Sequence, residues 1–244
     1  SGQNINYTIT NLPIGITYYV RTYLTNPLGT YYGNEVSFET PEPENPVYMD
    51  DNGFTVKAQD WAEVGMSGEL NGIIYTVVDN ETIREINGNV CTSLVTDMSE
   101  LFMNTSINES IKTFDVSNVT TMQGMFLDSP SSTGQGPDAN DNWFLYWDVS
   151  SVTDMSEMFL GTNFFYFYNN SSELILNLSS WDTSNVTSMS QMFSGTEIAN
   201  IGINNWDVSS VTDMSQMFYY ANNQHLTNYS EFNLDNWDVS SVTD

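Results

Sequence analysis

The residues most able to do chemistry in this sequence are aspartates that recur at a fixed place in a repeated block. Each follows an aromatic residue and precedes a Val-Ser or Thr-Ser pair, as in the Trp-Asp-Val-Ser run at 147–150. Stacked blocks would place these carboxylates about 5 Å apart, where each neighbouring pair repels by roughly 0.8 kcal/mol in water. The predicted acidic column consists of Asp115, Asp148, Asp182, Asp207 and Asp238.

Either of two interactions would offset that repulsion, and the sequence leaves both open. In the first, each carboxylate accepts the backbone N–H two residues later and forms an Asx turn. In the second, Ca²⁺ bridges carboxylates of adjacent blocks, because calcium prefers hard oxygen ligands. Calcium is the one cofactor that the sequence suggests. The oxygen-rich stretch around Asp138 and Asp141 is a further calcium candidate, although it lacks the twelve-residue spacing of an EF-hand loop.

A second acidic column follows a few residues later in each block. Thr and Ser interrupt it, and they keep a short hydrogen-bond acceptor but lose the charge. Helix capping tolerates that exchange and metal binding does not, so the sequence predicts helix N-caps here. The column consists of Asp97, Thr121, Asp154, Ser188, Asp213 and Asp244.

Aromatic residues near the insertions form the other candidate site. Insertions lengthen three of the repeats, and lengthened loops of a repeat protein emerge from one face and carry recognition. An exposed aromatic cluster there would bind a protein or a glycan, whereas packing against the neighbouring block is the competing interpretation. The candidates are Phe164, Phe165, Tyr166, Phe167 and Tyr168 in one insertion, with Tyr219 and Tyr220 beside another.

The sequence lacks the parts of an enzyme active site. Cys91 is the one cysteine and His225 the one histidine, which excludes a disulfide framework, a thiolate metal site and most transition-metal chemistry. We expect Cys91 to be a small buried residue and His225 to lie in a solvated loop. No nucleophile elbow or Gly-rich phosphate loop is present, so we expect no catalytic activity.

The amino-acid composition limits the kinds of molecule that the chain can bind. The 244 residues include 31 Asp and Glu against 4 Lys and Arg, which gives a formal net charge of −27. Nucleic acid needs clustered cations and is therefore excluded, and an anionic membrane surface is disfavoured. No segment reaches the roughly 18 apolar residues of a membrane helix. The 40% hydrophobic content nevertheless predicts a folded protein.

A 13-residue block recurs along the C-terminal part of the chain. Complete copies occupy 114–126, 147–159, 181–193 and 206–218, a fifth begins at Trp237, and a degenerate copy surrounds Val95. The base unit is about 24–25 residues, with insertions in three units. Such a period is typical of repeat proteins in which each unit covers the apolar side of the next.

Within a unit the apolar spacing changes. Ile201 and Ile203 precede Trp206 with period 2, which predicts a short strand. The run from Val152 to Phe159 has the i, i+3, i+6, i+7 spacing of a short helix, with an extended segment as the alternative. The predicted fold class is therefore an α+β solenoid, leucine-rich-repeat-like, with one strand and one helix per coil. Its predicted core contains Trp147, Trp181, Trp206, Trp237, Met155, Met158 and Phe159.

These blocks resemble the repeats of the BspA-type leucine-rich-repeat surface proteins, which also occur in mycoplasma lipoproteins and in secreted proteins of Bacteroidota. The resemblance covers residues 91–244 and rests on runs such as Trp-Asp-Val-Ser-Ser-Val-Thr-Asp-Met-Ser-Glu-Met-Phe at 147–159. It implies a bacterial, secreted or cell-surface protein with an adhesion function.

Three segments precede the repeats. Residues 47–90 contain period-2 runs and are predicted to form a β cap over the first coil. Residues 41–46 are a proline-rich linker. Residues 1–40 resemble the tyrosine-corner stretch and last hairpin of a fibronectin type III domain, whose earlier strands would precede Ser1. The chain is accordingly expected to be a fragment of a longer protein that ends within a repeat.

The sequence thus predicts a non-catalytic adhesion or binding module of a larger multidomain protein. Its partner would be a protein or glycan on a cell surface or in a matrix. The alternative is an architectural subunit of a large extracellular homo-oligomeric assembly or filament, in which the repeat face contacts other copies.

Overall fold

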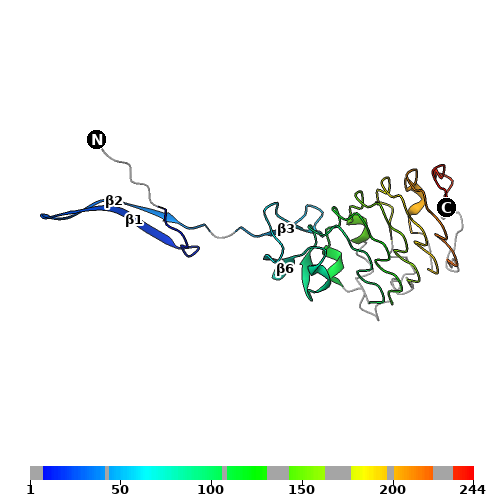
Figure 1. Cartoon of the computed structure of the whole chain (residues 1–244), viewed down its shortest axis with the longest axis horizontal. Coiled ribbons are helices and arrows are strands. Elements are labelled where there is room, and N and C mark those ends of the chain that lie inside the picture. The colour runs from blue at the N-terminus through cyan, green and yellow to red at the C-terminus, as the bar shows by residue number, and fades with distance from the viewer. Residues whose placement is uncertain are drawn as a thin grey trace. The chain divides into compact units, whose positions relative to one another are not determined.

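Figure 1 shows the computed structural model of the chain. The structure describes residues 8–41, 44–105, 109–130, 143–162, 177–196, 201–221 and 233–244. The chain divides into two compact units, Ser1–Glu44 and Asn45–Asp244. The boundary between them falls within the proline-rich segment 41–46.

The first unit is a β-hairpin. Strands β1 (Thr17–Asn26) and β2 (Gly29–Glu39) are antiparallel, with a register shift between Arg21 and Tyr23. Their aromatic and β-branched residues favour extended backbone. The Tyr18 hydroxyl donates a hydrogen bond to the Pro13 carbonyl over 3.4 Å, which is the type of contact that a tyrosine corner makes.

The second unit begins with the β cap, residues 47–90. Strands β3 and β4 form one small sheet, and β5, β6 and β7 form another in which β6 and β7 are parallel. These strands enclose a small core that includes Val47, Val56, Val77 and the fully buried Cys91. The elements are β3 (Val47–Met49), β4 (Val56–Ala58), β5 (Ser67–Leu70), β6 (Ile73–Val77), the 3₁₀ turn η1 (Thr82–Arg84) and β7 (Asn89–Cys91).

From β7 onward the chain winds into successive coils that lie side by side in Figure 1. We number the coils by their central valine: Val95 lies in the first coil, Val119 in the second, Val152 in the third, Val186 in the fourth and Val211 in the fifth. Isolated parallel β-bridges connect each coil to the next, from Asp97 through Thr121, Asp154 and Ser188 to Asp213.

Backbone hydrogen bonds run from coil to coil in a repeated pattern. In the third coil, Met155 N donates to the Ser188 carbonyl (3.0 Å) and Phe159 N donates to the Met192 carbonyl (3.0 Å). An exposed threonine next to the valine adds two bonds in the opposite direction. Thr153 donates both its backbone N–H (2.8 Å) and its hydroxyl (3.1 Å) to the carbonyl of Thr120. The coils are therefore held by a ladder that most of their residues share.

The predicted helix in each repeat is wrong, and so is the α+β solenoid class. The described residues contain small separate sheets, 3₁₀ turns and coil, and no α-helix. Glu157 has φ +58°, a left-handed conformation that a right-handed helix cannot accommodate. Met158 N bonds to Met155 O and Leu160 N to Glu157 O, so two successive turns create the three-residue spacing that suggested a helix. Equivalent left-handed residues are Glu100, Gly124, Gln191 and Gln216.

The strand predicted at Ile201 and Ile203 is also wrong, whereas Leu176 and Phe232 of the equivalent predictions lie outside the described residues. Ile203–Asn205 forms the 3₁₀ turn η5, and Trp206 N closes it by donating to Ile203 O over 3.2 Å. Ile201 and Ile203 are both buried because this turn faces the interior. Equivalent 3₁₀ turns are η2 (Glu109–Thr113) and η3 (Trp143–Tyr146).

Two columns of aromatic rings fill the centre of the stack. Trp181 stacks on Trp147 at 6.3 Å between ring centroids and on Trp206 at 6.0 Å, with rings within 8° of parallel. We call the second set the phenylalanine column; its ring centroids are 5.4 to 5.8 Å apart. Met155, Met158 and the predicted tryptophans are buried, except for the half-buried Trp237. The phenylalanine column consists of Phe102, Phe126, Phe159, Phe193 and Phe218.

Candidate functional site

Each aspartate of the predicted acidic column is held by a nearby serine of its own coil. Ser150 donates its backbone N–H (3.1 Å) and its hydroxyl (2.6 Å) to Asp148 Oδ1. Asp182 and Asp207 receive the same two bonds, and Asp238 receives the backbone bond from Ser240 over 3.0 Å. These are the hydrogen bonds of the Asx-turn explanation.

Hydrogen bonding also keeps two of these carboxylates ionised. The Ser209 hydroxyl and then its backbone N–H lower the pKa of Asp207 below its ordinary value. Ser240 lowers the pKa of Asp238 in the same way, against a smaller opposing effect from the charge of Asp207. Within the described ranges, no three acidic, His or Cys side chains converge on one point. Asp138 and Asp141 lie outside the described residues, and calcium at the column stays a prediction.

Asp115, at the start of the second coil, differs from the rest of its column because it is buried against the start of the first coil. The Ser93 hydroxyl donates to its Oδ2 over 2.6 Å, and Ser117 donates to its Oδ1. Burial lowers the pKa of Lys57, but the carboxylates of Asp115 and Asp50 outweigh that effect and raise it. Asp115 therefore ties the second coil to the start of the first coil. Nearby, burial raises the pKa of the Cys91 thiol, which disfavours a reactive thiolate.

The second acidic column does not cap helices, which corrects the prediction. Asp154 Oδ1 accepts the backbone N–H (2.8 Å) and hydroxyl (2.6 Å) of Ser156, and Asp213 accepts Ser215 N over 2.8 Å. These are again Asx turns, and they lead into the left-handed residue of each coil. The exchange with Thr121 or Ser188 is tolerated because a hydroxyl at the β-bridge position also accepts a hydrogen bond, as Thr121 does from Gln123 N.

Thr162 and Thr196 occupy equivalent positions, ten residues after the central valines of the third and fourth coils. Thr162 donates to the Phe126 carbonyl, and Thr196 donates likewise to the Phe159 carbonyl. The candidate residues 164–168 and His225 belong to the insertions of the repeats and lie outside the described residues.

Tyr219 and Tyr220 lie on the surface at the start of the last of these insertions. Their side chains are 53% and 79% exposed, and their rings are 4.3 Å apart at 62°. Tyr220 has φ +53°, at a place where the third and fourth coils have Gly161 and Gly195. The first and second coils have Asn104 (φ +56°) and Asp128 (φ +50°) at the same place, so this conformation belongs to the geometry of every coil.

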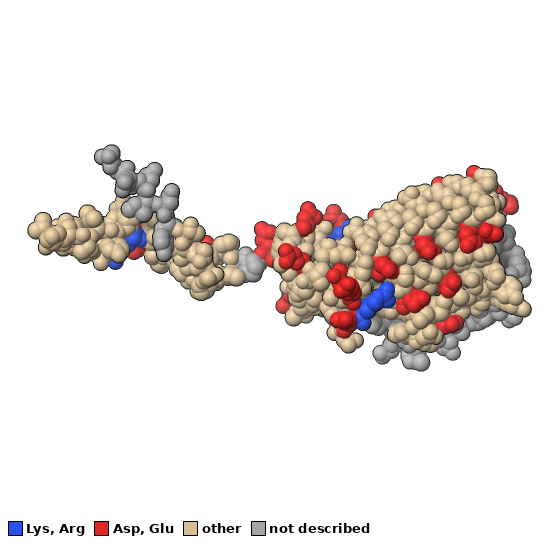
Figure 2. All heavy atoms as spheres, viewed as in Figure 1, with Lys and Arg blue, Asp and Glu red and all other residues tan. Residues whose placement is uncertain are grey.

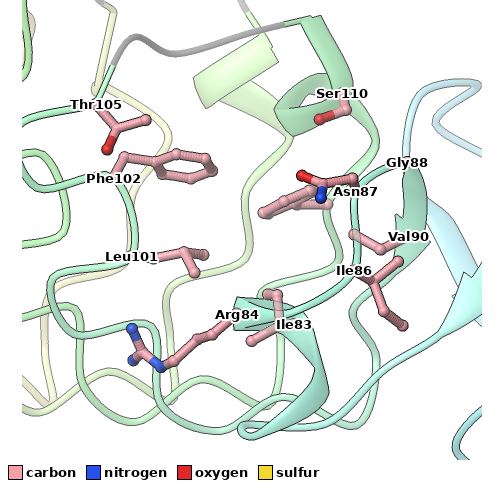
Figure 3. Close-up of a pocket in the computed structure, with 11 residues that line it drawn as sticks. Ile83, Arg84, Ile86, Asn87, Gly88, Val90, Leu101, Phe102, Thr105 and Ser110 are labelled. Atoms are coloured by element: carbon pink, nitrogen blue, oxygen red, sulfur yellow. The ribbon is translucent and has the colours of Figure 1, made fainter.

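A cavity of about 340 Å³ lies where the β cap meets the first coil (Figure 3). Leu101 and Phe102 lie on one side of it, and Ile83 and Asn87 face them from the opposite side. None of the lining residues is a Cys, a His or a carboxylic acid, so the cavity suits binding rather than acid–base chemistry. The lining residues are Ile83, Arg84, Ile86, Asn87, Gly88, Val90, Leu101, Phe102, Thr105, Ser110 and Phe114.

The sequence interpretation missed this cavity, although one residue signals it. Val90 lies five residues before Val95, at the place where the next coils have Phe114, Trp147 and Trp181. The column of rings therefore has no member at this level, and the smaller side chain leaves space. A repeat alignment that starts one position earlier would have identified Val90 as the exception.

Acidic side chains are spread over the visible face of the second unit, as Figure 2 shows. Lys57 and Arg84 each have a partner: Lys57 Nζ lies 3.6 Å from Asp50 Oδ2, and Arg84 Nη2 donates to the Ser99 carbonyl over 2.8 Å. The described surface of the second unit is therefore predominantly acidic. A search of the described residues finds no helix with the length and apolar character that crossing a membrane requires.

Comparison with known proteins identifies one family. Residues 73–166 and 138–244 each match the model described as "Mycoplasma protein of unknown function, DUF285". Together the two matches span residues 73–244, which include β6, the last part of the β cap and all the coils. No curated protein and no solved structure matches the chain.

Proposed function

The chain belongs to the DUF285 family of mycoplasma-type proteins, and on that basis we propose that it is a non-catalytic binding module of a bacterial secreted or cell-surface protein. The coil stack presents the binding surface, and its partner is a protein or glycan on a cell surface or in a matrix. In this proposal the repeats act as those of BspA-type adhesins do, and the hairpin unit is part of a fibronectin type III-like spacer.

The observation that carries the proposal is the Tyr219–Tyr220 pair. Two large aromatic side chains are exposed together, at 53% and 79%, and their rings lie 4.3 Å apart. Packing does not explain them, because both rings are more than half exposed. Exposed, closely spaced aromatic residues are typical of binding hot spots. Their place beside an insertion agrees with loops as the usual site of recognition.

The test uses the full chain on a glycan array and on surfaces coated with collagen, laminin or fibronectin. The double variant Tyr219→Ser, Tyr220→Gly should weaken retained binding at least tenfold, because hot-spot truncations cost about 2 kcal/mol or more. Glycine at 220 also relieves the left-handed strain, so this variant should fold. The matched control is Tyr31→Ser, which removes an exposed tyrosine from the hairpin unit.

Two outcomes would contradict the proposal. One is a chain that retains no partner on any of these surfaces at low or high salt. The other is equal retention of the wild type and the double variant.

A further inference from the structure

The β cap covers the first coil with side chains that substitute for a preceding coil. In later coils, the N–H of the threonine after the valine donates to the threonine carbonyl of the coil before, as Thr120 does to Thr96 over 2.8 Å. The first coil has no such neighbour. Instead, the side-chain oxygen of Asn80 accepts from Thr96 N (2.8 Å) and from Asp97 N (3.0 Å). The side-chain oxygen of Asn80 thus replaces a backbone carbonyl as the hydrogen-bond acceptor.

Arg84 makes the second substitution, at the carbonyl of Ser99. The equivalent carbonyls of Gln123 and Ser156 each accept an N–H from the coil before, from Glu100 and Gly124 over 2.8 Å. At Ser99 the donor is the Arg84 guanidinium, also over 2.8 Å. The cap therefore replaces the coil-to-coil bonds at two places of the first coil, through Asn80 and through Arg84. Between them, no described residue donates to the Asp97 carbonyl, although the equivalent Thr121 carbonyl accepts Met98 N.

The β cap does not supply the equivalent contacts for the Met-Phe part of the first coil. The carbonyl of Met125 accepts Phe102 N over 2.8 Å, and Met158 and Met192 carbonyls accept the equivalent phenylalanine N–H groups. Leu101 occupies this place in the first coil. Its carbonyl accepts no hydrogen bond from the part of the chain that the structure describes. The Met103 carbonyl is equivalent to the Leu127 carbonyl, which accepts Asn104 N, and within the described residues it too receives no N–H from an earlier segment. The carbonyls of Leu101 and Met103 therefore both lack the coil-to-coil donor that later coils have.

The cavity lies beside the first of these acceptors, because Leu101 lines it. Val90 leaves the column of large rings without a member next to Phe114, and Phe102, the first ring of the phenylalanine column, is only half-buried. Phe102 and Phe114 lie 6.1 Å apart and both line the cavity. Its 340 Å³ exceeds the space that one phenyl or indole ring needs, and pockets of this size hold small ligands or anchor side chains.

The charges around the cavity favour a basic occupant. Glu85 and Glu100 are exposed and adjoin the lining residues Arg84 and Leu101 in sequence, and Glu81 is exposed two residues before Ile83, in a chain with a net charge of −27. Arg84, the one cation among the lining residues, already donates to Ser99. Acidic surroundings attract cationic partners and repel anionic ones.

We propose that this cavity binds one aromatic side chain of an extended, basic peptide segment of a partner protein, and that a backbone N–H of the segment donates to the Leu101 carbonyl. The segment adds to the first coil the contacts that every later coil receives from the coil before it. This is strand addition at an open backbone edge, with a pocket that selects the side chain. The site is separate from Tyr219 and Tyr220 and does not depend on the function proposed for them.

The test measures fluorescence anisotropy of a labelled peptide, Lys-Met-Ser-Lys-Met-Phe-Leu-Lys, with the full chain. The peptide copies the run of residues 155–160 with a lysine in place of Glu157 and lysines at both ends. We expect saturable binding. Replacing the peptide phenylalanine by alanine, or methylating its backbone nitrogen, should each weaken binding at least tenfold.

Protein variants locate the site. Val90→Phe places a ring in the cavity and should also weaken binding at least tenfold. Leu94→Phe adds the same ring at an exposed position of the same coil and should leave the affinity unchanged. The Tyr219→Ser, Tyr220→Gly variant should bind the peptide as the wild type does, which separates this proposal from the proposed function.

Several results would overturn the proposal. The peptide fails to bind the wild type, or it binds the wild type and Val90→Phe equally, or its N-methylated form binds as well as the parent. If 4-methylphenol alone displaces the peptide at equal concentration, the cavity is a small-molecule site. If the chain self-associates in sedimentation and Val90→Phe abolishes this, the occupant is a second copy of the chain. The measurements with the alanine-substituted and N-methylated peptides use the wild-type protein. They therefore remain informative if Val90→Phe fails to fold.

Discussion

The hairpin unit and the coil stack are built from similar residues but differ in what covers them. Tyr19 and Tyr23 of the hairpin are 68% and 71% exposed, whereas Trp181 of the stack is 4% exposed. A hairpin strand has a neighbour on one edge and nothing on its faces within the described unit. Each inner coil has a coil on both sides. The difference shows that burial of an aromatic residue here depends on the repeat of the structure around it, because neighbouring coils bring identical side chains into register.

Removing one ring from the middle of a column should have the largest effect on the contrast between the stack and the hairpin unit. Trp181→Ala should lower the free energy of unfolding of the stack by about 3–5 kcal/mol, because it leaves a cavity between Trp147 and Trp206. Urea denaturation followed by circular dichroism measures this value.

Tyr23→Ala is the control in the hairpin unit. It removes a side chain that is mostly exposed, so the unfolding midpoint of the stack should not change. A small effect of Trp181→Ala, similar to that of Tyr23→Ala, would show that register between coils does not hold the stack together.

A smaller effect distinguishes the turns of the coil from the predicted helix. Gln216 has φ +55°, a conformation that costs a non-glycine residue about 1–2 kcal/mol. Gln216→Gly should therefore raise the free energy of unfolding by about 0.5 kcal/mol, after the loss of backbone entropy that glycine causes. Differential scanning calorimetry of the full chain measures the shift as a change in Tm.

Gln123→Gly is the matched control, because Gln123 is also exposed and its φ is not positive. This variant should lower the free energy of unfolding by about 0.5–1 kcal/mol. If both glycine variants were destabilising by the same amount, the left-handed position at 216 would be refuted.

The smallest effect concerns the acidic column and pH. Hydrogen bonds from Ser209 lower the pKa of Asp207, so folding is favoured above the unfolded value near pH 4 and this contribution is lost as the pH falls through the folded pKa. Ser209→Ala removes the hydroxyl donor and should raise the pKa of Asp207 toward its ordinary value. Carboxyl NMR titration of the full chain measures it.

Asp238 supplies the internal reference for that titration. Its pKa is lowered by Ser240 rather than by Ser209, so it should stay low in the Ser209→Ala variant. An Asp207 pKa that does not rise would mean that the serine hydroxyl is not the main cause of the shift. Addition of Ca²⁺ in the same experiment tests the calcium prediction, because a bound cation would lower both pKa values further.

The positions that face the interior could be predicted from the sequence, but the backbone between them could not. The recurrence of Trp, Met and Phe at fixed offsets was enough to assign the core, and Trp181, Met158 and Phe159 are buried. The same offsets gave the wrong secondary structure. Two successive turns and one helical turn both return a side chain to the same side after three residues, so apolar spacing does not distinguish them.

Among the candidate sites, the Asx turns could be predicted from the sequence and the cavity could not. Asp148 followed by Ser150 is a local pattern, and its Asx turn depends on contacts two residues apart. The cavity beside Leu101 depends on contacts between residues distant in sequence, from η1 to the end of the first coil. Local patterns report local hydrogen bonds, whereas a cavity is the space that several distant segments leave unfilled.

By itself, the sequence determined the repeat frame, the residues of the interior columns and the strongly acidic surface, because each follows from residue type and spacing alone. Only the tertiary structure decided that the coils contain turns instead of helices. The reason is that Glu157 and its equivalents adopt left-handed backbone so that the next residues can bond to the neighbouring coil. The tertiary structure likewise decided that the Leu101 carbonyl accepts no hydrogen bond from the described residues, since an unfilled acceptor is defined by what lies across from it and not by its own residue.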